Sequence, residues 1–410
     1  MKNSSFPRLI GIFLISPIIS MIFALRYKDV PWAKNIFWLY CIFFGYTMVI
    51  PSDQVDANRY VQWMLELSSA DMGFWDFVTQ LVKFEQYSDF VQPLLTYLVA
   101  KVSTDSRVLY AVFSIFFGFF YSRNIWIILR DVGVEKTVIG WGLFVTFFLT
   151  VPIWNVNAFR FNTAMHVFLF GVLNVFVYRK SYKGVFFMFF SALIHFSLIA
   201  PLLIFLFYRL FGDRIQLFFL LYLVTSVIST VDLSFISGLR PNLPAAISQK
   251  LISYSSADWI AQRESLTMRL NWYVYYYNDF VKLVVFLLFS SAFYWQRKLT
   301  EESGNLKSVF SFSLLFYSMV NLMVYLPEGS RFLMLANLVA FFFFIYFVSK
   351  CGTAMTFNLV KVPVIVILII TNVVMLRRGM DFIGVASVFG NLVTFGFMLE
   401  GDFPIIDFFK

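Results

Sequence analysis

The sequence predicts an all-α, polytopic transmembrane helix bundle of about 12–14 helices, some of them short or broken. Of its 410 residues 60% are hydrophobic and only 13% are charged, whereas soluble domains carry about 25% charged residues. Apolar runs follow one another along the whole chain, and short loops rich in Lys and Arg separate them. No soluble domain of ordinary size fits between the runs, so residues 1–410 are expected to form a single integral membrane domain.

The apolar runs define the expected helices in order. The first run has no small-residue cleavage site behind it, so it is expected to be a retained helix and not a removed signal peptide. The expected spans are 8–25, 34–50, 107–129, 137–152, 158–178, 184–211, 214–232, 274–295, 307–326, 331–349, 361–376 and 382–399.

The loop charges predict the topology. The net charge of +9 comes from Lys and Arg clustered in short loops, which is the positive-inside pattern of membrane proteins and gives no reason to expect a nucleic-acid partner. The most basic short loop holds Arg179, Lys180 and Lys183, so it is placed in the cytoplasm. The loop charges then agree throughout only if the run 184–211 is split at Pro201 into two short helices, because proline breaks a helix interior.

This topology gathers polar residues on the outer face. Residues 52–106 form one outer segment, in which 74–84 has the pattern of an amphipathic interfacial helix. Residues 233–272 form the largest C-terminal outer loop, followed by aromatic residues that include Tyr276. Asp53, Asp56 and Arg59 are spaced by three residues, so they share one face if the segment is helical, with Tyr60 beside them.

Two arginines open helices on the same outer face. Arg160 follows Asn157 at the start of one apolar run, and Arg331 follows a tight turn at the start of another. A positive charge near a helix N-terminus is unfavourable unless an anion is present, and guanidinium groups bind phosphate oxygens bidentately. The pair therefore predicts a pyrophosphate site. Snorkelling of Arg160 to headgroups and a surface ion pair between Arg331 and Glu328 are the alternative interpretations.

The two histidines receive different interpretations. His195 lies next to the expected helix break, where irregular backbone at membrane depth usually lines a cavity. His166 lies two turns below Arg160 and is expected to be a buried structural residue. The two cysteines, Cys41 and Cys351, show no metal or disulfide spacing. We expect no metal and no cofactor, since nucleotide, dinucleotide and metalloprotease motifs are also missing.

The layout resembles the EpsG family of Wzy-like bacterial polysaccharide polymerases. The stretch that carries the resemblance is NAFRFNTAMHVFLFGVLNVFVYRKSYKGVFFMFFSALIHFSLIAP, Asn157 to Pro201, with Asp53, Asp56 and Tyr60 upstream and Arg331 downstream. Members typically have a glutamine after the arginine, where this chain has Phe161 and then Asn162. The resemblance covers roughly residues 34–350 and implies a GT-C-like membrane glycosyltransferase of the bacterial inner membrane.

The resemblance also implies an activity. The expected enzyme joins undecaprenyl-pyrophosphate-linked oligosaccharide repeat units into O-antigen or exopolysaccharide chains on the periplasmic face, without a metal, and a chain-length regulator is a further candidate partner. The expected catalytic residues are Asp56, His195 and Asp53. The expected pyrophosphate-binding residues are Arg160, Arg331 and Arg59. The expected substrate-binding residues are Asn157, Tyr60 and Tyr276. An O-antigen ligase and a transporter or flippase of lipid-linked oligosaccharides are the alternatives.

Overall fold

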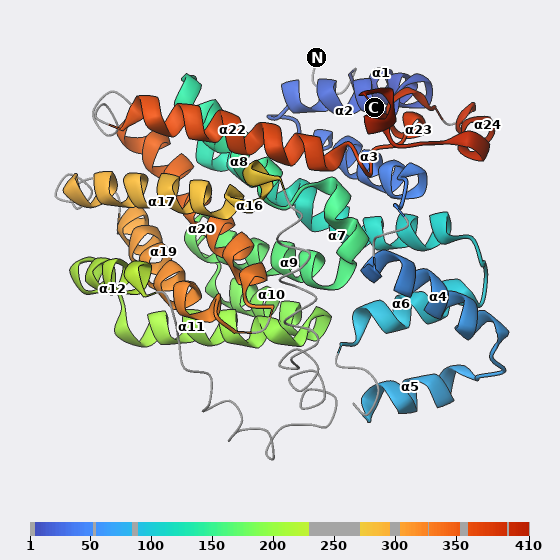
Figure 1. The fold of residues 1–410 in the computed structure, drawn as a ribbon, viewed down its shortest axis with the longest axis horizontal. Coiled ribbons are helices and arrows are strands. Elements are labelled where there is room, and N and C mark those ends of the chain that lie inside the picture. Colours follow the sequence, from blue (N-terminus) through green and yellow to red (C-terminus); the bar gives the residue numbers. More distant parts are fainter. Residues whose placement is uncertain are drawn as a thin grey trace.

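The protein is a bundle of α-helices (Figure 1). The computed structural model describes residues 5–51, 55–83, 89–228, 271–295, 304–326, 328–352, 360–391 and 393–409. Within these ranges no β-strand forms, and the only extended pairing is an isolated bridge between Gly384 and Pro404. The predicted all-α fold class is therefore confirmed.

The N-terminal region contains three helices, α1 (Ser5–Ile15), α2 (Pro17–Arg26) and α3 (Ala33–Thr47). The single helix expected over 8–25 is wrong, because the chain breaks at Ser16, which is extended. Proline disfavours the helical conformation in the residue before it, and Pro17 then takes the first position of α2, where its missing N–H costs nothing.

Three helices form a group at one side of the bundle, α4 (Val55–Ser69), α5 (Phe74–Val82) and α6 (Val91–Ala100), coloured blue to cyan in Figure 1. The amphipathic helix expected over 74–84 is present as α5. Its apolar face is partly used inside the protein, because Phe77 is buried and stacks on Tyr97 of α6 at a centroid distance of 4.3 Å. Phe74, Trp75 and Val82 remain exposed.

The centre of the bundle is α9 (Phe159–Phe176), in which every residue except Arg160 is buried. A helix that is apolar on all sides belongs in the middle of a bundle. It packs mainly against α10 (Ser181–Ile194) and α7 (Ser106–Trp126), which continues as a π-helical turn, η1 (Ile127–Gly133). Helix α8 (Val138–Thr150) precedes α9 in the chain. The short 3-10 helix η2 (Ile153–Ala158) joins α8 to α9.

The run 184–211 is broken, but not where the sequence suggested. Helix α10 ends at Ile194, His195 is extended, and a 3-10 turn, η3 (Phe196–Leu198), leads into α11 (Ile199–Phe211). The break expected at Pro201 is therefore displaced to His195. Pro201 lies in the first turn of α11, where backbone N–H groups have no partner within the helix, so proline is tolerated there.

The C-terminal half adds α12 (Ile215–Val227), the single turn α16 (Trp272–Tyr275), α17 (Tyr277–Tyr294), α19 (Gly304–Met323), α20 (Ser330–Cys351) and α22 (Lys361–Gly379). Most of α20 is buried. The outer loop expected over 233–272 lies almost entirely outside the described residues.

The last expected span, 382–399, is wrong. This region contains only short pieces, α23 (Val385–Phe389), α24 (Phe395–Met398), η5 (Leu399–Gly401) and η6 (Ile405–Phe409). Asp402 holds the turn together, since its carboxylate accepts hydrogen bonds from the backbone N–H groups of Ala386 and Phe403. A Cβ atom at Gly384 would lie 2.3 Å from this carboxylate and 3.0 Å from the carbonyl oxygen of Thr47, so glycine allows the close packing seen here.

The helices suit a membrane. Six helical stretches in the described part of the chain are long and apolar enough to cross a bilayer, judged by length and composition. These are Ser106–Gly133, Val138–Phe176, Tyr277–Tyr294, Asn305–Met323, Ser330–Cys351 and Lys361–Gly379. The protein is therefore a membrane protein with several spanning helices.

Candidate functional site

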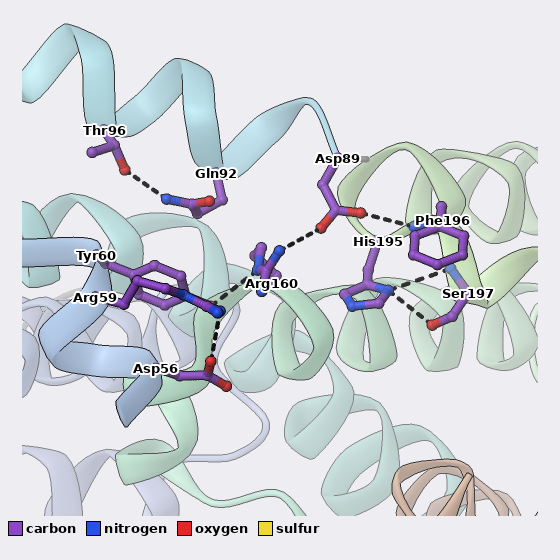
Figure 2. A network of polar contacts seen from close by, with 10 residues as sticks. All are labelled: Asp56, Arg59, Tyr60, Asp89, Gln92, Thr96, Arg160, His195, Phe196 and Ser197. Carbon is purple, nitrogen blue, oxygen red and sulfur yellow. Dashed lines mark hydrogen bonds and ion pairs between the residues drawn. The ribbon is translucent and has the colours of Figure 1, made fainter. Parts of the chain in front are cut away.

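A small polar cavity lies where α4, η2, α9, α20 and the break after α10 come together. Its volume is about 110 Å³. Asp56, Tyr60, Arg160, His195 and Arg331 are among the residues that line it. These side chains come from four distant parts of the sequence, and we call this space the arginine cavity (most of its polar neighbourhood is drawn in Figure 2).

Arg160 has a partner inside the protein. Its Nη1 lies 3.1 Å from Oδ2 of Asp89, and the two side chains are 20% and 1% exposed. Asp89 lies two residues before Val91, the first residue of α6, where a negative charge is favoured by the helix dipole. The anion that the position of Arg160 requires is thus already present in the chain, because buried Asp89 neutralises the guanidinium.

Tyr60 supplies the second fixed contact of Arg160. Its hydroxyl oxygen accepts a hydrogen bond of 3.1 Å from Nε. Burial raises the pKa of Tyr60, with a partly opposing effect from Arg160, so the phenol stays protonated at neutral pH. Two of the five guanidinium N–H groups of Arg160 thus donate to groups of the protein. The remaining N–H groups border the cavity.

Asp89 also ties the helix break to the arginine. Its Oδ1 accepts a hydrogen bond of 3.1 Å from the backbone N–H of Phe196, and the N–H of the neighbouring Phe90 donates to the carbonyl of Leu193. One carboxylate therefore contacts both α9 and the α10–α11 break (Figure 2). This bridge fixes where His195 lies relative to Arg160.

His195 has a defined ring orientation. The Ser197 hydroxyl lies 2.8 Å from Nδ1, and the Ser197 backbone N–H donates to the same nitrogen at 3.3 Å. A backbone N–H can only donate, so Nδ1 is an acceptor and the ring proton of neutral His195 is on Nε2. The ring packs edge-on against Phe161. His195 is thus arranged as a hydrogen-bond donor through Nε2.

Arg331 lies in the first turn of α20 and completes the cavity. Its Nε is 2.7 Å from Oε2 of Glu328, three residues earlier, and the two side chains are 38% and 23% exposed. The ion pair with Glu328, which was the alternative interpretation of Arg331, is therefore present. An exposed pair of this kind contributes at most about 1 kcal/mol, so Arg331 can exchange Glu328 for another anion at little cost.

Asp56 and Arg59 form a third ion pair of 2.7 Å in the first turns of α4. Asp56 lines the arginine cavity, but the side chain of Arg59 is 56% exposed and is not among the lining residues. Each of the three arginines is thus balanced by one acid, and the site is close to neutral before any ligand binds.

A second, larger cavity of about 400 Å³ adjoins the first. The two share Asn162, Arg331 and Met334 in their linings. We call the second space the asparagine cavity, because it is lined by five asparagines, Asn155, Asn157, Asn162, Asn278 and Asn337.

The residues predicted from sequence are only partly brought together. The structure gathers Asp56, Tyr60, Arg160, His195 and Arg331 around the arginine cavity. Asn157 lines the neighbouring asparagine cavity instead. Tyr276 is 47% exposed and lines neither cavity, whereas the next residue, Tyr277, lines the asparagine cavity. Asp53 lies outside the described residues. The roles assigned to all of these residues stay predictions.

Sequence reasoning missed Asp89 and most of the asparagines. Asp89 lies two residues before an apolar helix, and a lone carboxylate at such a position is the signal that could have identified it. His166 is buried as expected, with Nε2 3.0 Å from the carbonyl oxygen of Val151. No cluster of three or more His, Cys, Asp or Glu side chains that could hold a metal occurs among the described residues.

Comparisons of the chain with protein-family models, curated proteins and solved structures gave no significant match. Any functional conclusion therefore depends on the site itself and on the resemblance drawn from the sequence.

Proposed function

We propose that the protein is a glycosyltransferase that polymerises undecaprenyl-pyrophosphate-linked oligosaccharide repeat units into O-antigen or exopolysaccharide. The observation that supports this most is that Arg160 and Arg331, which begin two different helices, line the same cavity together with His195 and Asp56. Two guanidinium groups converging on one small polar space suit a pyrophosphate.

The proposed reaction has two requirements. A hydroxyl oxygen of the incoming lipid-linked unit forms a bond to the anomeric carbon of the growing chain, while the bond from that carbon to the pyrophosphate oxygen breaks. The electron pair of the broken bond leaves on the pyrophosphate, where Arg160 and Arg331 stabilise the developing charge. The hydroxyl proton must pass to a base.

Asp56 is the better base and His195 the better donor. Asp56 is a carboxylate on the wall of the arginine cavity. His195 accepts at Nδ1 from Ser197, which leaves its proton on Nε2, and a donor there suits a phosphate oxygen. His195 therefore joins the two arginines in holding the leaving group, and Asp56 removes the proton.

The ion pairs permit this chemistry. Arg160 is kept in place by buried Asp89 and by Tyr60, so it is preorganised and need not move when the ligand binds. Among the described residues Arg331 is held by Glu328 at the surface, so it can turn toward the pyrophosphate. Preorganised charge costs no reorganisation during the reaction.

We further propose that the protein resides in the bacterial inner membrane, with the arginine cavity facing the periplasm. Loop charge supports this orientation, since the most basic short loop, 179–183, is placed in the cytoplasm by the positive-inside rule. A periplasmic cavity would face the side on which flipped lipid-linked units are presented.

The test is a reaction with purified protein in detergent. Undecaprenyl-pyrophosphate-linked repeat units are added, and the glycan products are sized on a gel. Longer glycans support the polymerase, transfer only to an added lipid A core identifies a ligase, and no reaction with either acceptor favours a transporter.

Two variants make the test specific. Arg331→Gln should lower turnover about 10²-fold or more, as expected when one charge-stabilising group is lost. Arg107→Gln is the matched control, because it removes an arginine from an exposed ion pair with Asp105 that is not part of either cavity. Equal activity of the two variants would contradict the role of Arg331.

A further inference from the structure

The asparagine cavity is lined mainly by neutral polar and aromatic residues, with Arg331, Arg378 and Asp381 as its charged members. Besides its five asparagines it is lined by the aromatic residues Trp154 and Tyr277. Amide side chains offer both donors and acceptors without a net charge, and flat aromatic rings pack against apolar ring faces. Its volume of about 400 Å³ falls within the usual range of small-ligand sites, about 300–1,000 Å³.

Two of the asparagines are oriented by hydrogen bonds within the protein. The hydroxyl of Tyr317 donates to Oδ1 of Asn337 at 2.9 Å, so the amide NH₂ group of Asn337 remains as a donor. Nδ2 of Asn162 donates to the carbonyl of Asn155 at 2.7 Å, so Oδ1 of Asn162 remains as an acceptor. Both side chains are at least nine-tenths buried, at 3% and 5% residue exposure.

Three other polar side chains of the cavity make no hydrogen bond within the described part of the chain. The side chains of Asn155, Asn278 and Trp154 are of this kind, although all three line the cavity. Polar side chains in a concave site normally have partners. A fixed donor, a fixed acceptor and several further amide groups together match a ligand that carries many neutral hydroxyl groups.

We propose that the asparagine cavity binds sugar residues, namely those of the glycan directly attached to the pyrophosphate. This inference depends on the proposed function for the identity of the ligand. The two cavities share Asn162, Arg331 and Met334, and an anomeric carbon is one bond away from its phosphate oxygen. A pyrophosphate held by Arg160 and Arg331 therefore places the first sugar at the boundary and the next sugars among the asparagines.

Binding measurements separate this inference from the proposed function. The probes are undecaprenyl pyrophosphate without sugar and undecaprenyl-pyrophosphate-linked repeat units extracted from cells that produce the protein naturally. Affinity is measured by native mass spectrometry of the detergent-solubilised protein. The wild-type protein should bind the sugar-bearing lipid more tightly than the bare lipid.

Asn155→Ala and Asn278→Ala should each reduce the affinity for the sugar-bearing lipid about fivefold, the effect of one neutral hydrogen bond, and leave the affinity for the bare lipid unchanged. Neither side chain has a partner among the described residues, so these variants should leave no unpaired group behind. Asn271→Ala is the matched control, because Asn271 is exposed, precedes α16 and lines neither cavity.

The outcomes are distinct. If the bare lipid binds but the sugar adds no affinity, or if the asparagine variants weaken both lipids equally, the sugar site is refuted while the pyrophosphate site stands. If the bare lipid does not bind, or if Arg331→Gln leaves its affinity unchanged, the proposed function itself is refuted.

Discussion

The ion pair between Arg160 and Asp89 offers a sharp test of how the site is built. The side chain of Asp89 is 1% exposed, whereas that of Arg160 is 20% exposed. Arg160→Gln therefore leaves a fully buried carboxylate that keeps only the N–H of Phe196. Breaking a buried pair in this way costs about 3–5 kcal/mol of unfolding free energy, and we expect about 3 kcal/mol because Gln can still donate one hydrogen bond.

Asp89→Asn should be milder. The guanidinium is partly hydrated and keeps its contact with Tyr60, and the new side chain still accepts from Phe196. We expect a loss of about 1.5 kcal/mol, the lower end for a hydrogen bond to a charged group. The double variant should be more stable than the sum of the two losses by about 1–2 kcal/mol, since neither charge is then left without its partner.

The measurement is unfolding of the purified protein in mixed micelles of dodecyl maltoside and sodium dodecyl sulfate, followed by circular dichroism. Asp105→Asn is the control, because its pair with Arg107 is exposed and should change stability by less than about 1 kcal/mol. Losses that add within about 0.5 kcal/mol, or a larger loss for Asp89→Asn than for Arg160→Gln, would refute the reasoning. The double variant should lose about as much stability as Arg160→Gln alone and should lack the proposed polymerase activity.

Three further predictions concern the surroundings of the site. His195→Asn keeps an acceptor for the Ser197 N–H but removes the Nε2 donor. Turnover in the proposed reaction should therefore fall about 10²-fold, while the melting temperature stays unchanged. Full activity of this variant would mean that His195 has only a structural role. Burial raises the pKa of Tyr60, so the protonated phenol stabilises the fold below the ordinary tyrosine pKa of about 10, and this stability is lost as pH rises above it. Tyr60→Phe should therefore reduce the loss of unfolding free energy at alkaline pH in a denaturation series. An unchanged dependence of unfolding free energy on pH would contradict the pKa shift. Pro201→Ala should change the unfolding free energy by less than about 1 kcal/mol. Gly171→Ala should cost about 1–3 kcal/mol, because its Cβ would lie 2.7 Å from the carbonyl oxygen of Gly184. A larger loss for Pro201→Ala than for Gly171→Ala would contradict a helix break at His195.

The sequence was sufficient for the class of the fold and for most helices. Apolar runs predicted the central helices α7, α8, α9 and α20 close to their observed ends, because a chain in lipid must satisfy its backbone hydrogen bonds within each segment. It failed at 8–25 and 382–399. There proline and closely packed glycine decided the local path, and a hydropathy pattern does not contain that information.

Part of the candidate site was also evident in the sequence. Arg160, Arg331 and His195 stood out because charged or titratable groups at the ends of apolar runs are costly and therefore conspicuous. Their joint position around one cavity, however, is a property of the packed helices. The same holds for the exclusion of Arg59 and Tyr276 from its walls.

What the sequence alone determined is thus that this is an all-helical membrane protein with arginines at helix starts. What only the tertiary structure decided is which groups meet. Asp89 and Arg160 are 71 residues apart along the chain, and Arg331 is farther still, so no local pattern relates them. Helix periodicity acts over a few residues, whereas ion pairs and cavities depend on distances in space, and those distances are set only when the helices pack.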